Sequence, residues 1–106
     1  MLDRIESNHF SPLIGQTCQL RTPDGDKLTL RVDTVTTKPL SRMPDAPDEQ
    51  RMPFSVTLTA MQPTTFVDGL CTLELANLGQ LQNVWISRVA PLGRDASQAY
   101  FQIIFN

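Results

Sequence analysis

Short stretches in which apolar and polar residues alternate are the feature that most restricts the fold of this chain. Residues 16–22 and 27–36 both alternate with a period of two, which predicts two strands that each bury one face. The residues between them, Pro23-Asp24-Gly25-Asp26, have the composition of a tight turn. The two segments therefore predict an antiparallel hairpin.

The same alternation predicts four further strands, at 54–60, 70–76, 84–90 and 100–105. Leu78-Gly79-Gln80-Leu81 is interpreted as a turn before the fifth of the six. The N-terminus is the exception, because a cap at Asn8 or Ser11, then Pro12 and Gly15, predict a short helical turn. We predict an all-β domain over 1–106, with about six mainly antiparallel strands in a small barrel or sandwich.

Length and charge exclude several classes of protein. A chain of 106 residues fits one hydrophobic core. Nine basic residues against eleven acidic ones do not give the positive surface of a nucleic-acid binder. No apolar run approaches the ~18 residues of a membrane helix, and the first residues lack the apolar segment of a signal peptide. We expect a cytoplasmic protein with neither a nucleic-acid nor a membrane partner.

The residues that usually carry catalysis are scarce. His9 is the only histidine, and Cys18 and Cys71 both fall on the apolar phase of their strands. Buried cysteines are the expected interpretation, with a Cys18–Cys71 disulfide or a cysteine–histidine pair as alternatives. One histidine and two core cysteines cannot form a four-ligand zinc site, and no phosphate-binding glycine loop occurs. We expect no cofactor and no enzymatic activity.

Residues 37–53 interrupt the strands with four prolines and several charges, and form a longer connection than most compact domains contain. Loops of this length are either functional or disordered. Acidic residues at 45, 48 and 49 lack the turn glycine of a calcium loop. The candidate interaction residues here are Arg42, Asp45, Asp48, Glu49 and Arg51.

The fifth predicted strand supplies two more candidate interaction residues, and the C-terminal segment is a further candidate for a contact between subunits. Trp85 and Arg88 suggest an exposed aromatic and basic pair on the fifth strand. The last segment, 100–105, is apolar on both faces. Such a strand is buried on both faces, either inside the domain or at a contact between subunits.

The order of several short motifs resembles a family of short bacterial proteins with no assigned activity. The family shares an Arg-x-Pro-Phe-Ser element, a Leu-Gly turn, a Pro-x-Gly turn and a final Tyr before an apolar run ending in Phe-Asn. Here these are Arg51-Met52-Pro53-Phe54-Ser55, Leu78-Gly79, Pro91-Leu92-Gly93 and Tyr100 to Asn106. The chain departs where family members carry an aromatic residue, since Leu70-Cys71 follows Gly69. The resemblance implies no catalytic residue or cofactor, and an assembly role beside phage-tail-like or surface-fibre proteins.

The sequence therefore favours a non-enzymatic structural or protein–protein interaction module that binds a protein partner or forms a homo-oligomer. The alternative is a small-ligand-binding β-barrel, which requires an apolar pocket with a few converging polar groups.

Overall fold

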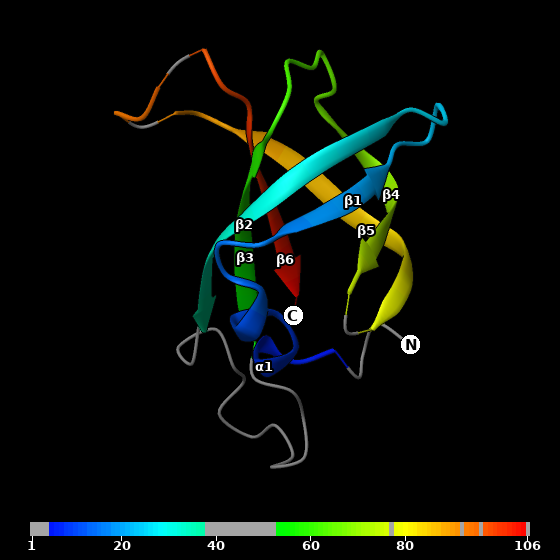
Figure 1. The fold of residues 1–106 in the computed structure, drawn as a ribbon, viewed down its shortest axis with the longest axis vertical. Helices are drawn as coiled ribbons and strands as arrows, with labels where there is room; N and C mark the ends of the chain where they lie inside the picture. The colour runs from blue at the N-terminus through cyan, green and yellow to red at the C-terminus, as the bar shows by residue number, and fades with distance from the viewer. Residues whose placement is uncertain (1–4, 38–52, 77, 92, 96, 106) are drawn as a thin grey trace.

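A closed barrel of six antiparallel strands forms the body of the molecule (Figure 1). The structure is a computed structural model that describes residues 5–37, 53–76, 78–91, 93–95 and 97–105. The strands are β1 (Thr17–Arg21), β2 (Lys27–Thr37), β3 (Phe54–Ala60), β4 (Asp68–Leu75), β5 (Gly79–Val89) and β6 (Tyr100–Phe105). The prediction of an all-β fold with about six antiparallel strands is confirmed, and the closed barrel excludes the sandwich.

The strands follow the order β1-β2-β3-β6-β5-β4 around the barrel, and β4 closes it against β1. β1, β2 and β3 are consecutive neighbours, and β4 then returns to lie beside β1 rather than beside β3. This is the Greek-key arrangement, in which the fourth strand lies next to the first. The connection at 61–67 must therefore cross one end of the barrel, and it lies at the end that also carries the β1–β2 turn (Figure 1).

The start of β5 differs from the prediction. The turn predicted at 78–81 lies earlier, where the Leu78 N–H donates to the Leu75 carbonyl, because β5 already begins at Gly79 rather than at residue 84. A β-bulge causes the difference, since the pairing with β4 shifts between Cys71 and Leu73 and Asn83 has a φ of 61°. The extra residue breaks the period of two that identifies a strand in a sequence.

The N-terminal segment closes the opposite end of the barrel (Figure 1). It consists of α1 (Ser7–Phe10) and a 3₁₀ turn, η2 (Ser11–Leu13). Phe10 is completely buried, and its ring lies 6.1 Å from that of Phe54 and 5.6 Å from that of Phe105, between centroids. Among the described residues, no helix is long and apolar enough to cross a membrane.

The predicted helical turn is present, but the predicted cap is wrong. The predicted turn around Pro12 is η2, whose N-cap is Phe10 rather than Asn8 or Ser11, and α1 begins earlier in the chain, after Glu6. The Glu6 backbone N–H donates to His9 Nδ1 at 2.9 Å. His9 therefore holds the first turn of the helix, which sequence motifs built on Ser, Thr, Asp and Asn do not reveal.

Side chains fill the interior of the barrel. All the inward-facing residues of β3 and β6 are at most 5% exposed, and these are Phe54, Val56, Leu58, Ala60, Phe101, Ile103 and Phe105. β6 lies between β3 and β5, so the apolar C-terminal segment is built into the barrel wall. Its outer face keeps one large apolar residue in solvent, Ile104, which is 54% exposed.

Candidate functional site

Three large apolar side chains are exposed on the outside of neighbouring strands. Trp85 of β5 lies opposite Leu70 of β4, and the two are 53% and 55% exposed. The pairing of β5 with β6 ends at the pair Ser87 and Gln102. Trp85 lies two residues before Ser87 on β5, and Ile104 lies two residues after Gln102 on β6. We call Leu70, Trp85 and Ile104 the outer apolar row. The cross-strand pair of Leu70 and Trp85 gives adjoining exposed apolar surface, and contiguous exposed apolar surface is typical of interaction sites.

Leu70 was missed as a candidate, although the sequence holds a signal for it. On β4 the buried residues are Cys71, Leu73 and Leu75, so Leu70 is an apolar residue on the solvent-facing phase. Trp85 breaks the alternation of β5 in the same way. An apolar residue on the polar phase of each of two strands is the signal that identifies Leu70 and Trp85.

The structure does not pair Trp85 with Arg88. The two are three residues apart on one strand, so alternation directs their side chains to opposite faces of the sheet. Arg88 Nη1 instead donates to the carbonyl oxygens of Thr64 and Phe66, both at 3.3 Å. Its backbone N–H donates to the Val67 carbonyl at 2.8 Å. Arg88 therefore holds the connection between β3 and β4.

The other predicted interaction residues lie outside the described part of the chain. They belong to the proline-rich segment, and are Arg42, Asp45, Asp48, Glu49 and Arg51. Their role as contacts stays a prediction.

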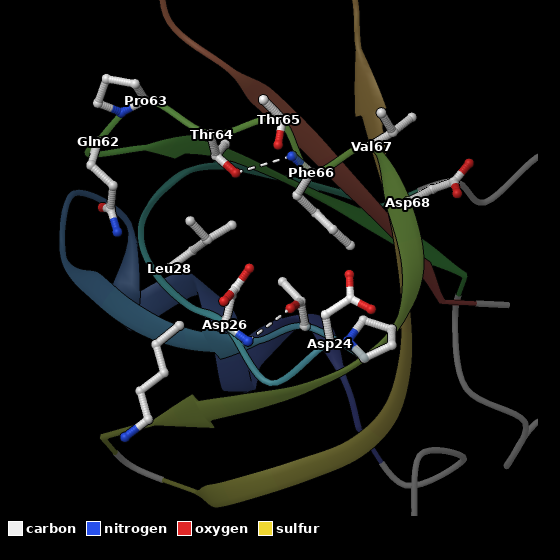
Figure 2. Close-up of a pocket in the computed structure, with 13 residues that line it drawn as sticks. Asp24, Asp26, Leu28, Gln62, Pro63, Thr64, Thr65, Phe66, Val67 and Asp68 are labelled. Carbon is white, nitrogen blue, oxygen red and sulfur yellow. Dashed lines mark hydrogen bonds between the residues drawn. The ribbon is translucent and has the colours of Figure 1, made fainter.

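A groove of about 900 Å³ lies between the β1–β2 turn and the β3–β4 connection, at the barrel end opposite α1 (Figure 2). Sequence analysis did not identify it, because two connections far apart in the chain form its walls. Leu28, buried at 6%, and Phe66, whose ring lies 5.9 Å from that of Phe101, contribute apolar surface. Polar and other residues complete the lining: Thr22, Pro23, Asp24, Asp26, Lys27, Gln62, Pro63, Thr64, Thr65, Val67 and Asp68.

Hydrogen bonds fix the turn that forms one wall. The Thr22 N–H donates to the Asp26 carbonyl at 2.9 Å, and the Gly25 N–H donates to the Thr22 carbonyl at 2.9 Å. The Asp26 N–H also donates to Thr22 Oγ1 at 3.2 Å. This explains why Thr22 is buried although it is polar. The turn therefore holds its two aspartates in a defined position.

The second wall is tied to the sheet. The Thr29 N–H donates to Gln62 Oε1 at 3.3 Å, and the Phe66 N–H donates to Thr64 Oγ1 at 3.1 Å. At the base of β4, a Cβ on Gly69 would lie 3.1 Å from Pro23 Cγ. A side chain at this position would crowd Pro23, and the φ of +155° also favours glycine, so Gly69 suits the close approach of β4 to the β1–β2 turn.

Acidic residues dominate the charge of the groove. Among the lining residues that the structure describes, Asp24, Asp26 and Asp68 stand against one cation, Lys27. Figure 2 shows the carboxylates of Asp24 and Asp26 directed toward the hollow, and that of Asp68 directed away from it. Among the described residues, neither Asp24 nor Asp26 has an ion-pair partner. The ion pair that the described residues do form lies outside the groove and joins Arg31 Nε to Asp33 Oδ1 at 2.8 Å.

The two cysteines are free thiols in the core, 6% and 2% exposed, as the main interpretation expected. The disulfide alternative is wrong, because Cys18 and Cys71 are not bonded to each other. Burial raises the pKa of both thiols from 9.0 to about 11. Neutral thiols are poor nucleophiles. Across the described ranges, no three His, Cys, Asp or Glu side chains gather as a metal site would require.

The chain matches a protein-family model described as a domain of unknown function (DUF6916) over residues 5–105. The chain belongs to this family. No curated protein matches it. No solved structure matches it either.

The DUF6916 match extends from the N-terminal segment to the end of β6. The barrel, the outer apolar row and the groove all lie within the matched range.

Proposed function

We propose that this chain is a non-enzymatic assembly module that associates with a second copy of itself through the outer apolar row. The carrying observation is the exposed cross-strand pair of Trp85 and Leu70. This proposal agrees with the phage-tail-like or surface-fibre assembly that the resemblance to short bacterial proteins implies. In such an assembly, each subunit needs a stable body and a surface for its neighbour.

The barrel favours a contact on its outside. Its interior is filled by side chains, as expected when about eight strands already leave room only for side chains or one small ligand. Two strands with neighbouring apolar residues in solvent offer a surface that association would cover. The ligand-binding alternative is left with the groove at the barrel end.

The contribution of Trp85 to association can be estimated from its area. A large aromatic side chain buries about 150–250 Å². Covering the exposed half at about 25 cal/mol per Å² gives roughly 2–3 kcal/mol for each tryptophan. Two copies covering both tryptophans gain roughly 4–6 kcal/mol before the entropy cost of association is subtracted, so the row contributes to self-association without fixing its affinity.

Light scattering and tryptophan fluorescence across a dilution series test the proposal. Trp85 is the only tryptophan, so its emission reports on the row without any label. We expect a mass above the 11.9 kDa of one chain at high concentration. On dilution the mass should fall, the emission should shift to longer wavelength, and acrylamide should quench it more strongly.

Leu70→Ser and Ile104→Ser keep the reporter and should weaken association. Ile14→Ser is the matched control, because Ile14 is 48% exposed but follows η2, next to β2 rather than β5. A mass of 11.9 kDa at every concentration would refute self-association. An Ile14→Ser variant as impaired as Ile104→Ser would show that the row is not the interface.

A further inference from the structure

The groove at the barrel end combines an apolar interior with an acidic wall. Leu28 and Phe66 supply the apolar surface, and Figure 2 shows the Phe66 ring reaching into the hollow. The carboxylates of Asp24 and Asp26 face the same space. A ligand that fits this groove needs an apolar part and a positive end.

The walls are already in place before any ligand arrives. Hydrogen bonds centred on Thr22 hold the acidic turn, and Arg88 holds the opposite connection through two carbonyl oxygens. A preformed site avoids much of the entropy cost of ordering loops on binding. The groove therefore does not need to close to bind.

We propose that the groove binds an arginine side chain on an extended basic segment of a partner protein. A guanidinium presents five N–H donors in one plane and matches carboxylates with two parallel hydrogen bonds. It also stacks on aromatic rings, and its aliphatic stem packs on apolar surface. Asp24, Asp26 and Phe66 provide these three kinds of contact in one place.

The size and the remaining lining favour a peptide over a small cation. A groove of about 900 Å³ lies at the upper end of the range for drug-sized ligands, far more than one guanidinium occupies. Gln62, Thr64 and Thr65 place amide and hydroxyl groups along the same wall. Such groups bond to a peptide backbone, which has both N–H donors and carbonyl acceptors.

This inference is independent of self-association, because the outer apolar row does not line the groove. The test is a titration of ¹⁵N-labelled protein, followed by NMR, with the peptide acetyl-Ala-Arg-Ala-Arg-Ala-amide. We expect saturable shift changes at the amides of Gly25, Phe66 and Val67. The same peptide with citrulline in place of arginine is uncharged but similar in shape, and should bind at least about tenfold more weakly.

The double variant Asp24→Asn, Asp26→Asn removes the charge and keeps the side-chain size, and asparagine suits turn positions. It should weaken binding of the arginine peptide by at least about tenfold. Glu74→Gln, the same charge change on an exposed residue of β4 outside the groove, should leave binding unchanged. Leu70→Ser should also leave it unchanged, which separates this site from the assembly surface.

Three results would overturn the inference. The first is the absence of shift changes at millimolar arginine peptide. The second is equal binding of the citrulline peptide, and the third is unchanged binding to the double variant. For the double variant, the ¹⁵N NMR spectrum itself shows whether the protein is folded.

Discussion

Phe10→Ala tests whether the N-terminal segment closes the barrel. Phe10 is completely buried and forms an aromatic cluster with Phe54 and Phe105, whose rings stack at 4.7 Å. Removing a buried phenylalanine ring typically costs 3–5 kcal/mol, since it loses apolar transfer energy and leaves a cavity. A domain of this size has a free energy of unfolding of roughly 5–15 kcal/mol. The variant should therefore lose a large share of its stability and remain only marginally folded.

Urea unfolding followed by far-UV circular dichroism measures this loss. The slope of the free energy against urea should stay close to the wild-type slope, because the surface exposed on unfolding hardly changes. Phe66→Ala is the matched comparison, because Phe66 packs at the other barrel end and is only partly buried. It should cost clearly less than Phe10→Ala, in proportion to the smaller area it buries.

A loss below about 1 kcal/mol in Phe10→Ala would refute this reasoning. So would a loss smaller than that in Phe66→Ala. Either result would mean that the strands alone close the barrel end at which α1 lies, and that packing of Phe10 contributes little to stability.

Two further predictions concern Arg88 and the buried thiols. Arg88→Gln removes the guanidinium that donates to the carbonyl oxygens of Thr64 and Phe66. Because Arg88 is exposed, the loss in the free energy of unfolding should stay at about 1 kcal/mol. Amide hydrogen exchange at residues 64–67 should become faster. An unchanged exchange rate would contradict its anchoring role. The pKa of Cys18 and Cys71 is raised by burial, so as the pH rises the thiols of the unfolded chain ionise before those of the folded chain. The contribution of the two thiols to the free energy of unfolding is therefore fully present below pH 9 and is lost as the pH rises toward about 11. Urea midpoints at pH 8 and 10.5 should show a steeper fall than in the double alanine variant, and parallel curves would exclude this cause.

The strands could be predicted from the sequence because each buries one face and therefore alternates. Barrel closure could not, because it depends on β1 pairing with β4 and on β3 pairing with β6, and these strands are far apart in the chain. Local periodicity carries no information on which strands are neighbours. The first part of β5 could not be recognised as a strand for a different reason. The bulge at Asn83 shifts the alternation of buried and exposed residues by one position.

The candidate site was predicted in part. Trp85 was correctly identified as an exposed aromatic residue, but Arg88 was assigned to it although strand alternation separates them. That error was avoidable, because an odd spacing on a strand places side chains on opposite faces. The groove was beyond prediction, because Asp24 and Phe66 meet only when the Greek-key crossover brings their connections together.

The start of β4 links the two proposed surfaces. Gly69 packs against Pro23 of the acidic turn, and the next residue, Leu70, already belongs to the outer apolar row. The connection that precedes β4 forms the other wall of the groove and is held by Arg88 of β5, the strand that carries Trp85. The two surfaces therefore adjoin through β4 and β5 but share no lining residue. Leu70→Ser should therefore weaken self-association and leave arginine-peptide binding in the groove unchanged, and a loss of both would show that the two surfaces are not separate.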